Sequence, residues 1–529
     1  MKYPIGLSII LNALAAISIL SGCSDYLDRE YDSFIDNEMT FTSYERTSKF
    51  LVNAYRYLPD GFNRIGSEAM LDAATDDAEH ANASCNIQYF NTGAWNSRSN
   101  PDDLWNKYYA GIRIANEFIE NVDRVNLDKY RLDPDNQNEY QNRLNDLKTW
   151  KYEARFLRAF FHFELVKRFG PVPVITSTLS VNADYSETPR PSMDDCISFI
   201  SSECDKVAEV LDLTPGRGID SDLGRATKGA ALALKSRVLL YAASPLYLNW
   251  QNLSERDLPS DMEKWKAAAQ AAKDVIDLGI YSLYGSYATL FKNNFQNSEF
   301  ILMRRYGNNS DFEKYNFPVS YGGVGGINPS LNLVDSYEMK DGSYFSWENE
   351  ENAVRPQFYR DDRLNATILL NDSVWKSTAV ENWDGGKDGL GVTNATKTGF
   401  YLKKYLNEDV NIQTGGGSQG HIWPLFRLAE IYLNYALNEY DPENTDIAEY
   451  INRVRSRAGQ PNLPSGLTQD EMRERIRRER RVELAFEEHR SWDVRRWKIA
   501  QETLGGDLLG LEITRKNQAR RAVTRNSVI

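Results

Sequence analysis

The chain has few of the residues that build metal centres or disulfide frameworks. Its 529 residues include only 4 cysteines and 4 histidines. The histidines are scattered along the sequence, and the Cys-x-x-Cys spacing of a zinc site is absent. The sequence therefore gives no support to a metal site, and we expect no cofactor.

Long hydrophobic runs are also absent, apart from one at the N-terminus. The run from Ile5 to Leu20 is short for a membrane span, follows Lys2, and leads into Ser21-Gly22-Cys23. These features are typical of a lipoprotein signal, although an ordinary signal peptide with a coincidental cysteine has the same outline. We predict a signal peptide over 1–22, a lipidated Cys23 and a polar tether over 23–40.

The remaining cysteines do not suggest disulfides. Without Cys23 their number is odd, and only Cys85, Cys196 and Cys204 remain. Cys196 and Cys204 lie in a segment with helical periodicity, where their spacing corresponds to roughly 12 Å along the axis. A disulfide spans no more than about 7 Å, so these two thiols cannot pair within one helix.

Positive charge is in deficit. The chain has 62 Lys and Arg against 75 Asp and Glu, and its net charge of −13 becomes −14 when residues 1–22, with Lys2, are removed. An acidic surface repels phosphate, so no nucleic acid partner is expected. The arginine-rich run 473–481 alternates with glutamates, as on an ion-paired helix.

Aromatic residues make up 12% of the chain, which is more than helix packing requires. This excess indicates a surface that binds a ligand or a partner.

Helical periodicity dominates both ends of the chain. Apolar residues from Leu144 to Leu165 recur every three or four positions and predict one long helix that ends before Gly170-Pro171. Two further faces, from Leu425 to Ala436 and from Ile447 to Ala458, predict an antiparallel helix pair joined at Asp441-Pro442. More helices are predicted over 41–58, 101–124, 192–212, 225–244, 261–278 and 468–488.

The paired helices resemble tetratricopeptide units in their small and aromatic contact residues, but no strict repeat of about 34 residues is present. Residues 281–423 differ in being rich in Gly, Asn, Ser and Tyr, which indicates loops with short strands. Their glycine runs lack the strand–loop–helix setting of a phosphate site. The predicted fold class is mostly α: a tetratricopeptide-like scaffold of helical hairpins with an inserted, loop-rich, mixed α/β subdomain.

A set of longer segments follows the N-terminal signal in a fixed order. They read LDAATDDA at 71–78, NPDDLWNKYYAGIRIANEFIENV at 100–122, EARFLRAFFHFELVKRFGPVPV at 153–174, NPSLNLVDSYEMKDG at 328–342, RDDRL at 360–364, RLAEIYLNYALNEY at 427–440, INRVRSRAG at 451–459 and RRERRVELAFEEHRSWDVRRW at 477–497. In this combination the chain resembles the SusD/RagB family of Bacteroidetes outer-membrane lipoproteins, over nearly all of its length after Cys23.

The resemblance implies an organisation and a role. Tetratricopeptide-like helix pairs would occupy 41–280 and 424–529, and the ligand-binding insert 281–423. The protein would be lipid-anchored in the outer membrane, face the cell exterior, bind an oligo- or polysaccharide, and deliver it to a SusC-like TonB-dependent transporter without catalysis. The chain departs from the family at its end, TRKNQARRAVTRNSVI, so the resemblance does not extend to the last packing contacts.

Trp95 is the first candidate for a glycan site, because the resemblance places an aromatic residue of its loop there. A flat ring suits sugar C–H groups, and Asn96 and Arg98 suit hydroxyls. The alternative is that Trp95 packs on the helix beneath it. Asp77 is a further candidate. With Asp76 it would serve a glycoside hydrolase only across a cleft of roughly 5 to 10 Å, and a capping or supporting role is the other interpretation.

The insert supplies a second set of candidates, Tyr306, Tyr315, Tyr321 and Trp347. A glycan platform needs two or three rings in an arc, with fixed donors and acceptors between them. Each ring alone is also compatible with core packing. Glycan binding is thus the predicted function, and the alternatives are binding of a peptide or another nutrient, or a secreted glycoside hydrolase.

Overall fold

The computed structural model describes residues 36–180, 182, 184–186, 188–214, 223–251, 260–292, 295–354, 356–436, 446–514 and 519–525. Cys23 and the signal and tether up to residue 35 lie outside the described residues, as does the turn at Asp441-Pro442. Within the described ranges, no helix combines the length and the apolar character needed to cross a bilayer.

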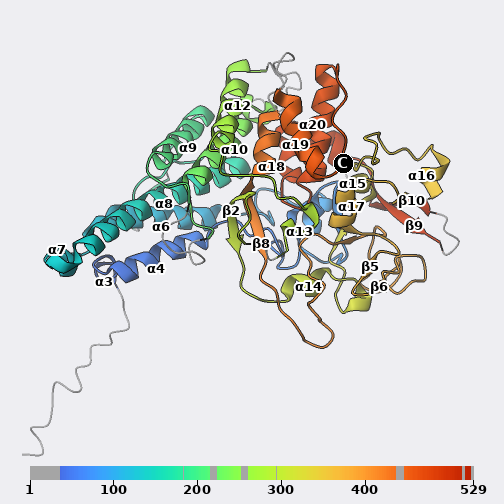
Figure 1. Ribbon diagram of the computed structural model, residues 1–529, viewed down its shortest axis with the longest axis horizontal. Helices are drawn as coiled ribbons and strands as arrows, with labels where there is room; N and C mark the ends of the chain where they lie inside the picture. Colours follow the sequence, from blue (N-terminus) through green and yellow to red (C-terminus); the bar gives the residue numbers. More distant parts are fainter. Residues whose placement is uncertain are drawn as a thin grey trace, which may run out of the picture.

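The long helices form one continuous stack, seen across the upper half of Figure 1. Each helix packs against the next: α6 (Trp105–Asn121), α8 (Gln137–Phe169), α9 (Met193–Ala208), α10 (Lys228–Ala243), α12 (Met262–Ile276), α18 (Leu428–Ala436) and α19 (Asp446–Arg457), with α20 (Gln469–Glu483) against both α18 and α19. This stack confirms the prediction of a mostly α scaffold of packed helix pairs.

Local sequence signals set the ends of these helices. Ser192 and Asp195 form a capping box at the start of α9, and Thr468 and Glu471 form another at the start of α20. The α8 helix ends at Gly170, whose φ of 72° and ψ of −150° suit only glycine. The predicted end before Gly170-Pro171 is therefore confirmed.

Shorter helices fill the spaces around the stack: α3 (Asn37–Phe41), α4 (Tyr44–Tyr55), α5 (Gln88–Asn91), α7 (Asp128–Arg131), α11 (Pro245–Leu248), α13 (Tyr287–Leu290), α14 (Asp311–Asn316), α15 (Leu331–Val334), α16 (Glu350–Val354), α17 (Asp362–Thr367), α21 (Arg490–Arg496) and α22 (Ala500–Leu504). Single 3₁₀ turns occur at η1 (Leu71–Ala74), η2 (Val122–Arg124), η3 (Pro134–Asn136) and η4 (Val319–Tyr321).

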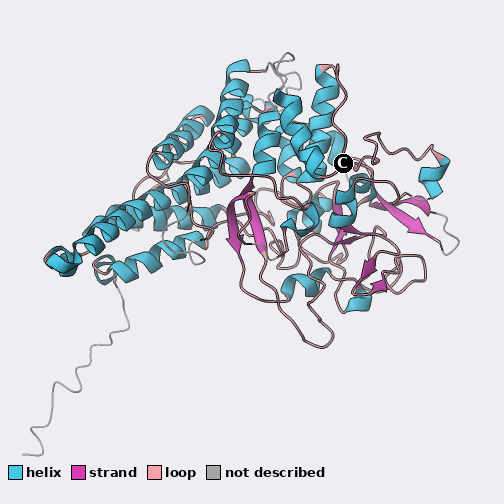
Figure 2. Cartoon of the chain, viewed as in Figure 1, coloured by secondary structure: helices cyan, strands magenta, loops and turns pink. Residues whose placement is uncertain are grey.

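The strands are short and pair two by two, in antiparallel fashion (Figure 2). The pairs are β1 (Ala78–His80) with β3 (Ile327–Pro329), β2 (Phe300–Arg305) with β8 (Ile422–Arg427), β4 (Ile368–Leu369) with β7 (Tyr401–Leu402), β5 (Val374–Trp375) with β6 (Thr378–Ala379), and β9 (Leu508–Ile513) with β10 (Ala519–Arg525). The loop-rich character predicted for 281–423 is confirmed. The prediction was wrong at Leu425, which lies in β8 because pairing with β2 extends the strand to Arg427.

The three cysteines of the described chain, Cys85, Cys196 and Cys204, are free and buried. Cys196 and Cys204 lie on the same helix, α9, as the sequence indicated. Burial raises the pKa of the Cys85 thiol to about 12 and also raises that of Cys204.

The arginine-rich helix α20 is ion-paired, but mainly with other elements. Along the helix itself, Arg478 lies 3.7 Å from Glu474, the spacing that the sequence predicts. Two arginines reach other elements: the buried Arg480 donates to Asp493 of α21 at 2.6 Å, and the partly buried Arg481 pairs with Asp77 beside β1 at 2.7 Å. The helix thus ties the C-terminal region to the N-terminal loops.

Candidate functional site

Two clefts of similar size, about 890 and 860 Å³, open on the described residues. The first is lined by Trp95, Trp250, Trp492 and Trp497, and we call it the tryptophan cleft. The second is lined by residues of β9 and of the segment 354–373, and we call it the β9 cleft. Both have the volume of a small-molecule binding site.

The tryptophan cleft is assembled from five separate parts of the chain. Trp95 comes from the loop between α5 and α6, Trp250 from the segment after α11, and Trp492 and Trp497 from α21 and its C-terminal end. The end of α8 adds Lys167 and Arg168, and α22 adds the rim residues 500–502. The cleft therefore depends on the whole helical stack.

Trp95 is held in place with its ring at the surface. Its side chain is 43% exposed, and its ring centroid lies 5.3 Å from that of Phe90 on α5. The backbone nitrogen of Trp95 donates to Tyr89. The Asn96 side chain accepts from the backbone nitrogens of Arg98 and Ser99, which closes a tight turn immediately after the tryptophan. Trp95 thus packs on the preceding helix, α5, and also keeps a face open to the cleft.

The other three tryptophans lie deeper. Trp492 and Trp497 are buried, and neither indole nitrogen has a hydrogen-bond partner among the described residues. Lys167 and Arg168 lie 4.6 and 4.9 Å from the Trp492 ring, a cation–π arrangement. The ring of Trp250 stacks near that of Tyr247 at 6.2 Å. These rings form an apolar wall behind Trp95.

Charges around the cleft are mostly paired. Asp102 accepts from Arg64 and from Arg168, and Glu164 lies 2.7 Å from Lys167. Burial would raise the pKa of Glu164, but the neighbouring Lys167 and Arg168 outweigh it and bring the pKa down to about 2. Burial lowers the pKa of Lys167 to about 8 in spite of Glu164. The wall is therefore an ionised, tightly bonded network with little freedom to rearrange.

Arg495 is different because no carboxylate pairs with it among the described residues. Its Nη1 donates to the Ser491 backbone oxygen at 2.6 Å, and its guanidinium lies 5.4 Å from the Trp492 ring. Arg495, Asn100 and Gln501 line the same cleft. The arrangement offers hydrogen-bonding groups beside flat apolar rings, which suits a ligand that has both polar and apolar faces.

The other predicted residues lie elsewhere. Asn96 and Arg98 are exposed beside Trp95 but do not line the cleft. Asp77 is fully buried under Arg481. Of the insert rings, Tyr306 packs edge-on against Phe62, and Tyr315 lies half-buried on α14. Tyr321 donates to the Trp375 backbone oxygen at 3.2 Å, and Trp347 donates to Asp335 at 2.9 Å. None of these four rings is among the residues that line either cleft.

The carboxylates of Asp76 and Asp77 are bound to arginines. Both oxygens of Asp76 accept from Arg490 at 2.8 Å, and Asp77 accepts from Arg481 at 2.7 Å. The void beside Asp77 measures only about 10 Å³. This pair therefore supports the loop and leaves no space for a sugar between the two groups. No cluster of three or more potential metal ligands occurs in the described part of the chain.

Sequence reasoning missed most of the tryptophan cleft. Trp492 and Trp497 lie in a segment whose sequence fits ordinary core packing, and both are buried, but both also line the cleft. Trp250 carried no local signal, because its partners lie 155 residues before it and 242 after it. Only Trp95, in its polar loop, was identifiable from its neighbours.

The fold and the cleft together define a ligand-binding protein built on a helical-repeat scaffold. Residues 289–526 match the model of the SusD family, and residues 25–240 match a model described as starch-binding and associating with the outer membrane. The chain belongs to the SusD/RagB family. This finding confirms the resemblance that the sequence motifs indicated.

Individual relatives cover nearly the whole chain. The SusD-like protein P25 of Formosa agariphila is 25% identical over 521 residues, which cover 90% of this chain and 87% of that protein. The SusD-like protein P38 of the same organism is 23% identical and covers 96% and 94%. A solved SusD-like protein from Bacteroides fragilis has a TM-score of 0.76 and 25% identity over 94% of each chain. A laminarin-binding SusD-like protein has the same fold, with a TM-score of 0.63, 22% identity and coverage of 87% and 93%.

Proposed function

We propose that this protein captures an oligo- or polysaccharide in the tryptophan cleft and delivers it to a SusC-like TonB-dependent transporter in the outer membrane. The observation that carries the proposal is the half-exposed Trp95 ring, held over a cleft of about 890 Å³ whose wall contains three further tryptophans. A sugar ring has an apolar C–H face and a polar rim, and this cleft matches both.

The comparisons support the carbohydrate as ligand. Proteins of the same family and fold are described as starch-binding, laminarin-binding and carbohydrate-binding. A role in binding rather than catalysis agrees with the arginine-bound Asp76 and Asp77. Peptide or another nutrient is the alternative ligand, because flat rings and polar groups also suit a peptide chain.

The anchoring and the transporter follow from the sequence and the family. Lipidation of Cys23 would fix the chain to the outer membrane through the tether that precedes α3, with the body facing the cell exterior. A protein that only binds its ligand needs a channel partner for uptake, and the SusC-like transporter is the partner that the family resemblance implies.

Affinity gel electrophoresis tests the ligand. Residues 24–529 are run in native gels that contain starch, laminarin, xylan, pectin or a host glycan, beside the variants Trp95→Ala and Tyr185→Ala. Tyr185 is a matched control because it is 38% exposed and lines neither cleft. We expect one polymer to retard the wild-type protein and the Tyr185 variant, and to retard Trp95→Ala much less.

Two outcomes would contradict the proposal. Retardation that Trp95→Ala leaves unchanged would place the ligand outside the tryptophan cleft. Silence with every polysaccharide, combined with retention of a peptide mixture, would favour the peptide alternative. Co-purification of the full-length chain with its transporter from outer membranes, lost with Cys23→Ala, tests the anchoring and delivery steps separately.

A further inference from the structure

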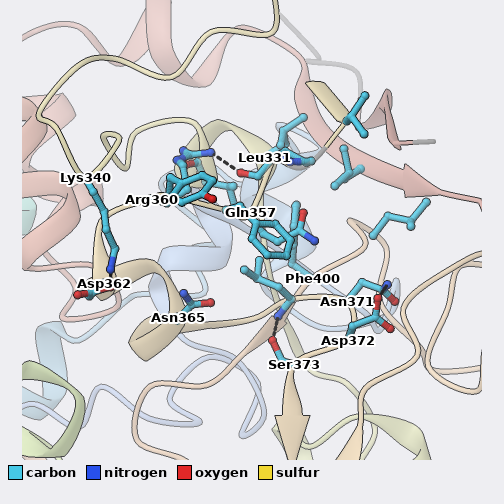
Figure 3. A pocket seen from close by; sticks show the side chains of 18 residues that line it. Leu331, Lys340, Gln357, Arg360, Asp362, Asn365, Asn371, Asp372, Ser373 and Phe400 are labelled. Atoms are coloured by element: carbon cyan, nitrogen blue, oxygen red, sulfur yellow. Dashed lines mark hydrogen bonds and ion pairs between the residues drawn. The ribbon is translucent and has the colours of Figure 1, made fainter. Parts of the chain in front are cut away.

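The β9 cleft has the size of the tryptophan cleft but a different lining. Its floor is apolar, from Leu331, Phe400, Leu511 and their neighbours, and two aromatic side chains, Phe358 and Tyr359, stand at its edge. Figure 3 shows Lys340 and Asp362 on one side of the cleft and Asn371, Asp372 and Ser373 on the other. Asn365 and Phe400 lie between these two groups in the figure and also line the cleft.

The two edge rings are more exposed than an aromatic side chain normally is in a folded chain. Tyr359 is 68% exposed and Phe358 is 48% exposed, and their ring centroids lie 6.5 Å apart. Tyr359 also has a φ of +57°, in the left-handed region that a bulky side chain rarely adopts. Displaying an apolar ring in water from a strained backbone is unfavourable, and such strain is concentrated at binding sites.

The neighbouring residues hold this backbone firmly. The backbone nitrogen of Lys340 donates to the backbone oxygen of Tyr359 at 2.7 Å. Arg360, the next residue, is buried, and its guanidinium donates to the backbone oxygens of Pro356 at 2.8 Å and Tyr337 at 2.8 Å. These bonds pin the chain on both sides of the two rings. The exposed position of Tyr359 is therefore built into the fold.

Polar side chains also line the β9 cleft, around its apolar floor. The exposed Asn365 side chain makes no hydrogen bond with any described residue. Asn371 donates to the exposed carboxylate of Asp372 at 2.9 Å, and Lys340 and Asp362 form a solvent-exposed pair at 2.9 Å. These donors and acceptors are available to hydroxyl groups above the floor.

From this combination we infer that the β9 cleft is a second carbohydrate-binding site, which takes a further segment of the same polysaccharide that enters the tryptophan cleft. Rings fixed at the surface suit the apolar face of a sugar ring, and the Asn365 amide with the exposed groups of Asp372 and Lys340 suits its hydroxyls. A protein partner would bury the Lys340–Asp362 pair and Asp372 away from water, which is costly for groups without additional partners. This inference rests on the proposed function.

The chain connects the two clefts directly. The α22 helix lines the tryptophan cleft with Gln501 and Glu502, and the following strand β9 lines the second cleft with Leu511 and Ile513. The nine residue-to-residue steps from Glu502 to Leu511 span at most roughly 32 Å even when the chain is fully extended. One polysaccharide chain of sufficient length therefore reaches both sites, whereas a short oligosaccharide occupies one. Binding at two linked sites strengthens the overall affinity without any new contact.

Isothermal titration with polymer and short fragments separates the two sites. The probe is the polysaccharide that retards the protein among starch, laminarin, xylan and pectin, used as the polymer and as its disaccharide to hexasaccharide. The variants are Tyr359→Ala, the double variant Phe358→Ala/Tyr359→Ala, and the control Tyr185→Ala. The backbone bond from Lys340 to residue 359 survives in the alanine variants, and unchanged thermal unfolding verifies their fold.

We expect Tyr359→Ala to weaken polymer binding about tenfold or more and to leave the affinity for the short fragments unchanged. In Trp95→Ala, we expect weak polymer binding that disappears when Tyr359→Ala is added. Equal polymer affinity of wild type and both β9-cleft variants would overturn the second site and leave the proposed function intact. Loss of fragment binding in Tyr359→Ala would also overturn it, since the two sites would not be separate. Absence of all carbohydrate binding by the wild type would overturn the proposed function itself.

Discussion

Arg427 and Glu483 form an ion pair that water does not reach. The Arg427 Nη1 lies 2.7 Å from the Glu483 carboxylate, and Nη2 donates to the Glu483 backbone oxygen at 2.7 Å. The same guanidinium contacts Glu299 and Glu487, each at 2.7 Å. Because Arg427 ends β8 and Glu483 ends α20, the pair joins the β2–β8 strand pair to the helix α20.

Removal of this arginine should strongly destabilise the fold. Arg427→Met removes one cationic partner from each of the buried carboxylates Glu299, Glu483 and Glu487, and breaking a buried pair costs about 3–5 kcal/mol. Urea unfolding followed by circular dichroism measures the loss. Arg131→Met is the control, since Arg131 pairs with Asp128 at the surface, where we expect a loss below about 1 kcal/mol. Similar losses in the two variants would contradict a structural role for the buried network.

Stability should also fall in acid because of Glu164. Burial alone would raise its pKa, but Lys167 and Arg168 lower it from 4.5 to about 2. A carboxylate with a lowered pKa in the folded state stabilises the fold above its unfolded pKa, and this contribution is lost as the pH falls from about 4.5 to about 2. The contribution is about 3 kcal/mol at neutral pH. The free energy of unfolding, measured at several pH values between 6 and 2.5, should decrease in this window.

Glu164→Gln provides the comparison for the acid effect. The variant lacks the titrating group, so its stability should be lower at pH 7 and should depend less on pH below 4.5. Glu203, whose pKa is also lowered to about 2 against the opposing effect of burial, stays in place and gives part of the remaining dependence. If the free energy of unfolding depends on pH equally in the variant and in the wild type, Glu164 does not cause the loss of stability in acid.

The thiols should be inert in the native protein. Cys85, Cys196 and Cys204 are buried, and burial raises the pKa of each of them. Only the thiolate reacts with iodoacetamide, so we expect no labelling of these residues at pH 8 without denaturant and labelling of all three in urea, as read by mass spectrometry. Ser97→Cys, at an exposed position, should label rapidly under native conditions. Rapid native labelling of Cys204 would mean that α9 opens on a short timescale.

The sequence predicted the helices well because their signals are local. The long helix α8 follows from the spacing of apolar residues up to Leu165 and from the glycine at its end. The error at Leu425 has a non-local cause, since the residue is apolar in both interpretations and only pairing with β2 selects the strand. Periodicity alone does not distinguish such cases.

The candidate site was predictable only in part, for the same reason. Trp95 stands out because its neighbours in the loop are polar, whereas Trp250 and Trp492 stand among residues that fit ordinary packing. These tryptophans lie close together because of the order in which the helices stack. No pattern within a single segment predicts that order. The same holds for Tyr359, whose exposure follows from the bonds of Arg360 to distant backbone oxygens.

Gly170 ends the helix α8 and packs against the Trp250 ring of the tryptophan cleft. A substitution at this position therefore tests both the scaffold and the cleft. A Cβ atom at this position would lie 2.2 Å from the Trp250 ring, so the ring must move in Gly170→Ala. The backbone there, with φ of +72°, adds a cost of roughly 1–3 kcal/mol. We expect lower thermal stability together with glycan binding weakened about tenfold, measured by titration with the polymer that retards the wild-type protein.

Gly279→Ala separates the two effects of the Gly170 substitution. Gly279 has a φ of +66°, and nothing lies within 4 Å of its Cβ position, so alanine there brings backbone strain without displacing any ring. It should lower stability by roughly 1 kcal/mol and leave glycan affinity unchanged. If Gly170→Ala loses stability but binds as the wild type does, then Trp250 contributes nothing to the ligand. In that case the ligand-binding residues of the tryptophan cleft are limited to Trp95 and the polar groups around Arg495.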